Sequence, residues 1–150
     1  MRFTAYQDYQ TILKFNKELL NVVVDTPVII YKVNLTETKL NIYGESLSKA
    51  QYVGVQVSCL INRPEVQTNE DVGITDIDQM VQFAFLRTTL EEKNIYVEIG
   101  DVVWFDSSFY EINTTNEVQL YAGQVLYNHQ ILADAHLMRV VPSQLQSTIL

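Results

Sequence analysis

Apolar residues recur at helical spacing near the start of the chain. Residues 4–23 read as an amphipathic helix, and the helix ends before Pro27, because a proline disfavours helical backbone in the residue that precedes it. The predicted apolar stripe lies at i, i+3, i+7 and i+10, and consists of Ile12, Phe15, Leu19 and Val22. We expect this helix to pack on the core of its own domain; the alternative is an arm that docks on a neighbouring molecule.

Beyond Pro27 the pattern changes to that of β-structure. Residues 28–33 are rich in β-branched side chains and predict a strand, and residues 55–61 predict a second one. Alternation places Val55, Val57, Cys59 and Ile61 on one apolar face, so Cys59 is expected to be a buried, unreactive thiol rather than a nucleophile. The polar stretches 36–52 and 62–77 predict long surface loops.

Residues 79–89 are apolar on both faces of a predicted strand. Val81, Phe83 and Phe85 alternate on one face, and Met80, Ala84 and Leu86 on the other. A strand of this kind is covered on two sides, either by a second layer of the same chain or by another subunit.

The clearest local signal is a β-hairpin over residues 98–113. Gly100 and Asp101 form a turn, and two aromatic and β-branched runs follow on either side of Asp106-Ser107-Ser108. A last strand is expected over residues 131–141, with Asp134 and His136 on the same face, about 7 Å apart and able to form an electrostatic pair.

These elements predict a mainly-β fold, a small β-barrel or sandwich with an N-terminal α-helix and long loops. We expect a single domain over residues 1–150, with a helical arm at 1–26, a β core at 27–141 and a flexible tail at 142–150. No apolar run approaches the length of a membrane-spanning helix, and no membrane association is expected.

Charge changes this picture, because it is unevenly distributed. The chain of 150 residues has a formal net charge of −8, and residues 64–118 hold twelve acidic and only two basic side chains. A strongly acidic middle repels phosphate, so the chain is a poor candidate for a protein that grips duplex DNA. The alternative interpretation is that these acids only keep the domain soluble.

No pattern in the sequence points to catalysis. One cysteine and two histidines seven residues apart provide no zinc-binding set, and the acids around Asp71 have the wrong spacing for a calcium loop. There is no Gly-x-Ser-x-Gly motif and no glycine-rich phosphate loop. We therefore expect neither an enzyme nor a bound cofactor or metal.

Several short motifs resemble the neck proteins of T-even-like contractile-tailed bacteriophages. The resemblance rests on Glu98-Ile99-Gly100-Asp101-Val102-Val103-Trp104-Phe105, then Phe109-Tyr110-Glu111-Ile112, then Gln119-Leu120-Tyr121-Ala122-Gly123-Gln124. Tyr43-Gly44-Glu45 and Ala135-His136-Leu137-Met138-Arg139 are also similar to segments of that family. The similarity thus touches most of residues 43–139.

This resemblance implies a structural role in the virion. Neck proteins of this kind form a ring, hexameric in the T-even case, which seals the DNA-filled head and provides the surface for tail docking. The implied partners are further copies of the chain, the portal and adaptor ring, and tail-terminator proteins, and the implied location is the virion neck after synthesis in the host cytoplasm. Genomic DNA would cross the ring without specific binding.

Two groups of residues are the candidate sites for that role. Loop acids are expected to face the channel or its mouth, and they are Glu70, Asp71, Asp76 and Asp78. Large apolar side chains are expected to form contacts between subunits, and they are Phe83, Phe85, Trp104, Phe109 and Tyr110. The alternatives are a tail-terminator or adaptor ring protein and, from another class, an oligonucleotide-binding β-barrel module whose aromatic side chains stack on bases.

Overall fold

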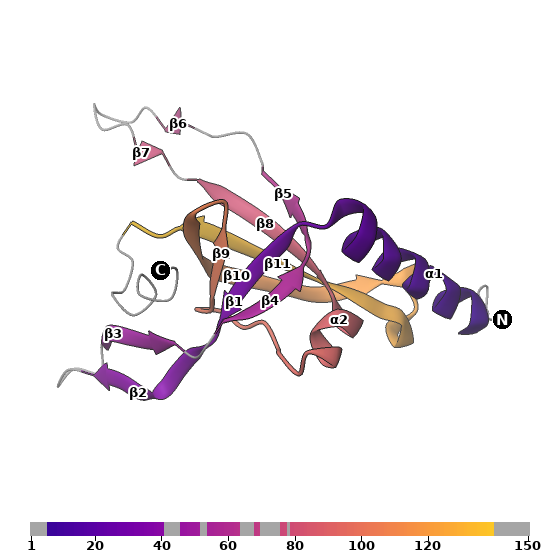
Figure 1. Cartoon of the computed structure of the whole chain (residues 1–150), viewed down its shortest axis with the longest axis horizontal. Coiled ribbons are helices and arrows are strands. Elements are labelled where there is room, and N and C mark those ends of the chain that lie inside the picture. The colour runs from indigo at the N-terminus through magenta and orange to yellow at the C-terminus, as the bar shows by residue number, and fades with distance from the viewer. Residues whose placement is uncertain are drawn as a thin grey trace.

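The fold is mainly β: a nearly closed antiparallel barrel of seven strands with an N-terminal helix of 19 residues (Figure 1). The computed structural model describes residues 6–40, 46–51, 54–63, 68–69, 76–77 and 79–139. The strands follow the spatial order β4-β1-β9-β10-β11-β8-β5. Their bounds are β1 Pro27–Tyr31, β4 Val55–Ser58, β5 Leu60–Asn62, β8 Met80–Leu86, β9 Val102–Phe105, β10 Ser108–Leu120 and β11 Asn128–Leu137. The predicted fold class is confirmed, and the β-layer is a barrel rather than a sandwich.

One short segment supplies both edges of the seven-stranded sheet. β4 pairs with β1, whereas β5 pairs with β8 at the other end of the strand order, and only Cys59 separates β4 from β5. The Cys59 amide donates a hydrogen bond to the Thr26 carbonyl over 3.1 Å. The single strand predicted at 55–61 is therefore two strands that Cys59 separates, and the prediction that Cys59 is buried is confirmed.

The barrel interior contains the apolar face that alternation predicted for β8. Val81, Phe83 and Phe85 are buried in the main core, and the Phe83 ring meets the Tyr110 ring edge to face with centroids 5.8 Å apart. The alternating face of β11 fills the same core, with Ile131, Ala133 and Ala135 buried. On the outer face predicted for β8, Ala84 and Leu86 are buried whereas Met80 is 46% exposed, so the strand is covered on both sides only over its second half.

Four of the five candidate interface residues are buried within the single chain. Phe83, Phe85 and Tyr110 belong to the main core, and Phe109 packs with Tyr31 and Val102 in a second cluster on the outer face of the barrel. Trp104, at the edge of that second cluster, is half-buried. Four of these side chains thus complete the interior of one chain and are not exposed on its surface; the expectation that the five residues form contacts between subunits stays a prediction.

The hairpin predicted at 98–113 is confirmed as β9 and β10. Asp106 and Ser107 form its two-residue turn with φ angles of 49° and 61°, the left-handed conformation that matches the twist of the two strands. Asp101, at the base of the hairpin, is buried. Its carboxylate accepts hydrogen bonds from Lys32 Nζ at 2.7 Å, from the Glu98 amide at 2.8 Å and from the Val33 amide at 3.3 Å. Asp101 thus joins the end of β1 to the loop that precedes β9.

The polar stretches contain strands that the sequence did not predict. Within 36–52, predicted as a loop, β2 (Val33–Leu40) pairs with β3 (Ser46–Gln51), and within 62–77, β6 (Thr68–Asn69) pairs with β7 (Asp76–Ile77). The segments are mainly polar and their few apolar residues do not alternate over a whole strand, so they lack the pattern that reveals a half-buried strand. The first of these hairpins, β2–β3, extends from one end of the barrel, and the N-terminal helix lies at the other end (Figure 1).

The strand predicted at 79–89 is shorter than expected. β8 ends at Leu86, and α2 (Arg87–Glu92) follows it and buries Thr89 and Leu90. A one-and-a-half-turn helix carries too few residues to establish a helical period in the sequence.

Among the candidate channel-facing acids, Glu70, Asp71 and Asp78 lie outside the described residues, and Asp76 is described only as part of β7. The tail at 142–150 also lies outside the described residues.

Removal of the Phe83 ring is expected to destabilise the monomer itself. Phe83→Ala leaves a cavity in the main core and should lower the free energy of unfolding by about 3–5 kcal/mol in urea denaturation. The control is Phe15→Ala, which changes an exposed ring and should lie within about 0.5 kcal/mol of wild type. If Phe83→Ala keeps the stability of wild type but weakens assembly, Phe83 contributes to a contact between subunits rather than to the core of one chain.

Burial raises the pKa of the Cys59 thiol from 9.0 to about 12. The folded protein should therefore not react with a thiol reagent at pH 8, and it should react fully in denaturant. Above pH 9.0 the unfolded chain loses the thiol proton while the folded chain keeps it, so the contribution of Cys59 to stability falls as the pH rises towards 12. The difference in unfolding free energy between wild type and Cys59→Ala should therefore shrink over this interval; a constant difference would contradict the burial.

Candidate functional site

Side chains that could perform chemistry do not cluster in the part of the chain that the structure describes. Those residues contain no group of three metal-ligating side chains, and none of their helices is long and apolar enough to cross a membrane. The Asp134 carboxylate, predicted to pair with His136, accepts hydrogen bonds from Gln82 Nε2 at 2.8 Å and from Thr114 Oγ1 at 3.1 Å. These bonds from β8 and β10 hold Asp134 in a structural role on the outer face of the barrel.

The N-terminal helix is instead the element with an unusual surface. It consists of α1 (Tyr6–Glu18) and a π-helical turn, η1 (Leu19–Val24), and it ends where Asp25 takes a left-handed conformation with φ of 39°. The Asp25 amide donates to the Leu20 carbonyl over 3.0 Å and closes the last turn. The helix predicted at 4–23 is thus confirmed over the described residues.

The side of this helix that packs on the barrel is not the predicted one. Tyr9, Leu13 and Leu20 are buried, whereas the predicted stripe residues Phe15 and Val22 are 66% and 71% exposed. Leu13 and Leu20 are seven residues apart, as are Phe15 and Val22, and the two pairs lie about 200° from each other around the helix. The helix therefore has apolar residues on opposite sides, and only one side is covered. We call Phe15, Val22 and the equally exposed Val23 the outer arm line.

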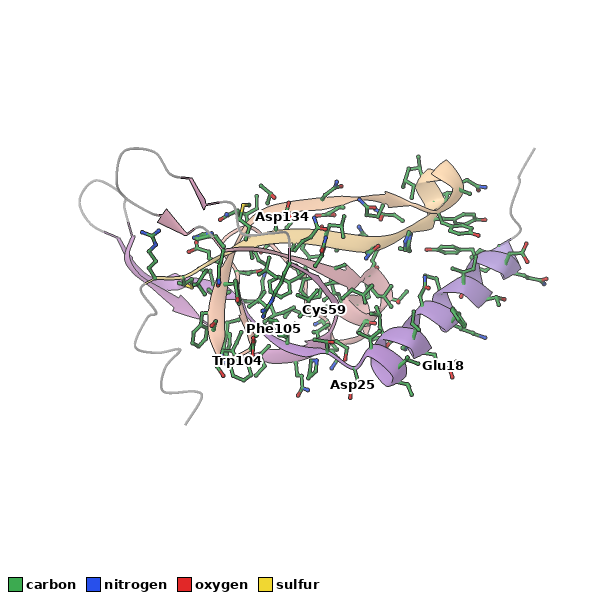
Figure 2. All side chains as sticks on the ribbon, turned by 90° about the horizontal axis from the view of Figure 1, so that it is seen from above. Glu18, Asp25, Cys59, Trp104, Phe105 and Asp134 are labelled. Atoms are coloured by element: carbon green, nitrogen blue, oxygen red, sulfur yellow. The ribbon has the colours of Figure 1, made fainter. Side chains whose placement is uncertain are left out.

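The covered side of the helix contacts the end of the β10–β11 hairpin. The Tyr9 ring stacks on the Tyr127 ring with centroids 4.3 Å apart, and Leu13 and Tyr121 pack beside them. Both α1 and this hairpin extend from the same end of the barrel (Figure 1), and the hairpin end lies above the first turns of α1 in the view of Figure 2. A salt bridge of 2.5 Å from Lys17 to Glu92 also ties α1 to α2, although both side chains are exposed.

The hairpin end holds two further apolar side chains in solvent. Between β10 and β11 the chain forms two 3-10 turns, η2 (Tyr121–Gly123) and η3 (Val125–Tyr127), and Ala122 and Gly123 both have positive φ. Val125 and Leu126 are 81% and 79% exposed, the highest values among the large hydrophobic residues that the structure describes. We call these two residues the hairpin tip.

Polar contacts connect β10 to its neighbours at the base of the tip. Arg87 Nη2 lies 3.5 Å from Glu117 Oε2, and the Asn128 side-chain amide donates to the Glu117 carbonyl. Burial raises the pKa of the Tyr9 hydroxyl, and the nearby Arg87 guanidinium partly opposes that shift. The hairpin tip and the outer arm line are thus presented by one connected unit.

The distribution of charged residues in the sequence also marks the hairpin tip, although the hydrophobic pattern does not. Residues 119–133 hold no Asp, Glu, Lys or Arg, in a chain whose middle third is strongly acidic. An uncharged tract with two exposed aliphatic residues near its middle is typical of a contact surface. Comparison of the chain with protein-family models and with curated proteins gives no match.

Loss of the tyrosine stack is expected to release the helix. Tyr9→Ala removes the ring between α1 and the hairpin, and it should increase amide hydrogen exchange over residues 6–24 by at least about tenfold. Lys17→Ala is the control, because an exposed ion pair contributes only about 0–1 kcal/mol. Equal exchange in both variants would show that the tyrosine stack does not hold the helix.

Proposed function

We propose that this chain is a structural subunit of a phage neck, which forms a ring that closes the DNA-filled head and receives the tail. The observation that carries the proposal is the outer arm line, together with the separate hairpin tip. Small monomeric proteins rarely expose large apolar side chains in groups, and such groups mark contacts with other proteins. Neither surface surrounds a group of catalytic or metal-binding side chains, so assembly is the role that they fit.

The charge of the chain supports the same role. A channel that DNA crosses must not hold phosphate, and acidic or neutral walls repel it. The net charge of −8 arises mainly from residues 64–118. We keep the prediction that Glu70, Asp71, Asp76 and Asp78 face the channel as a hypothesis, which a structure of the assembled ring with these side chains on the outer rim would overturn.

A tail-terminator or adaptor ring is the alternative within the same class, because either would also need subunit contacts. The barrel fold is compatible with an oligonucleotide-binding module, but the positions of the aromatic side chains do not favour that function. Phe109 and Tyr110 are buried, and the Arg63 guanidinium lies over the Phe105 ring, 5.1 Å from its centroid. The aromatic side chains that could stack on bases are Trp104, Phe105, Phe109 and Tyr110, and among them only Trp104 is half-buried with no cation recorded over its ring in the described part of the chain.

A head-completion assay tests the proposed function. Purified chain is added to DNA-filled heads that lack their neck protein, followed by tails, and infectious particles are counted. We expect the chain to bind to these heads and to restore tail joining. In sedimentation, the chain should copurify with the heads as a ring. In parallel, we expect no salt-dependent binding to single-stranded oligonucleotides at physiological ionic strength, because the chain is acidic.

Two results would overturn the proposal. If heads neither bind the chain nor join tails, the neck function is wrong. If the chain binds oligonucleotides tightly and the binding weakens with salt, the barrel is a nucleic-acid module instead. Tail joining that requires the chain to be bound first to tails rather than to heads would assign it to the tail-terminator ring.

A further inference from the structure

We infer that the outer arm line of one subunit packs against the hairpin tip of the next copy of the same chain. The inference rests on the proposed function and identifies the contact from which the ring is built. Both surfaces are apolar and uncovered within one chain, and they lie at the same end of the barrel (Figure 1).

The first step is the two-sided helix. Inside one subunit, the side with Tyr9 and Leu13 packs against the base of the β10–β11 hairpin through the Tyr9–Tyr127 stack. Phe15 lies about 200° around the helix from Leu13 and faces away from that hairpin. A second hairpin on this opposite side would cover the remaining apolar side chains, so that each helix lies between its own hairpin and that of a neighbour.

The second step is the electrical neutrality of both surfaces. Copies of a chain with a net charge of −8 repel one another, unless their contact avoids the acidic parts. The helix at 6–24 holds two acidic and two basic residues, and the tract 119–133 that contains Val125 and Leu126 holds no charged residue. Neither surface carries the net negative charge of residues 64–118, so a contact between the two adds little to the repulsion between copies. One exposed carboxylate, Glu18, falls between Phe15 and Val22 along the helix and would lie at this contact.

The third step is the symmetry of the contact. The outer arm line and the hairpin tip are different surfaces, so their contact is head-to-tail. A linear row of subunits joined in this way has a free outer arm line at one end and a free hairpin tip at the other. Head-to-tail contacts close into a ring when the rotation between subunits completes a circle. A contact of one helix with a copy of itself would stop at a dimer instead.

Crosslinking in trans tests the contact. Phe15→Cys and Val125→Cys are prepared as separate proteins, one with a mass tag, and they are mixed in solution and on the heads of the completion assay. A short bismaleimide is then added. The buried Cys59, with its pKa raised to about 12, does not compete for the reagent. We expect a crosslinked heterodimer of the two variants and, for the doubly substituted chain, a ladder that ends at the size of the ring.

Ile99→Cys is the matched control. Ile99 is a large hydrophobic residue as exposed as Phe15, but it lies in the loop before β9. Phe15→Cys mixed with Ile99→Cys should give at least about tenfold less crosslinked heterodimer. Phe15→Asp and Val125→Asp should each weaken assembly about tenfold or more, because each buries a charge in the contact.

The outcomes separate this inference from the proposed function. If the variants bind to heads and restore tail joining but crosslink no better than the Ile99→Cys control, the contact is wrong and the neck function stands. If the unmodified chain neither self-associates nor binds to heads, both are wrong. Efficient crosslinking in solution without head binding would support the contact and overturn the neck function.

Discussion

The near-closure of the barrel depends on the short segment that holds β4, Cys59 and β5. Because β4 and β5 belong to one short segment, the chain pairs with β1 on one side of that residue and with β8 on the other. A sheet of seven strands with two free edges would expose unpaired backbone groups along both. Here the two edges converge on one buried residue, and Lys93 Nζ donates to the Gln56 carbonyl of β4 over 2.6 Å and covers part of that edge.

The features that the sequence predicted are those encoded over short distances. The β9–β10 hairpin follows from local alternation and turn residues, and the buried face of β11 follows from alternation alone. The packed side of the helix could not be predicted, because Leu13 with Leu20 and Phe15 with Val22 give the same period. Burial of Phe83 and Phe85 within one chain could not be predicted, because a strand that is apolar on both faces has the same pattern whether the second face meets another layer of its own chain or another subunit.

The proposed contact surfaces were harder to find for a related reason. Exposure of Val125 and Leu126 is set by two left-handed residues, Ala122 and Gly123, and by the stack of Tyr127 on a tyrosine from the other end of the chain. Neither the turn geometry nor the distant partner has a periodic signature. A search for uncharged tracts in an acidic chain would have located the hairpin tip, although not its relation to the helix.

The distance in sequence between Tyr9 and Tyr127 also affects the order of events during synthesis. The helix is translated well before the hairpin on which it packs. Until that hairpin is made, the helix has apolar residues on both sides and no partner on either, which makes this stage prone to association with other nascent chains. Docking of the helix therefore reports that the hairpin has been translated, and the two surfaces that we propose for assembly come together only after that point.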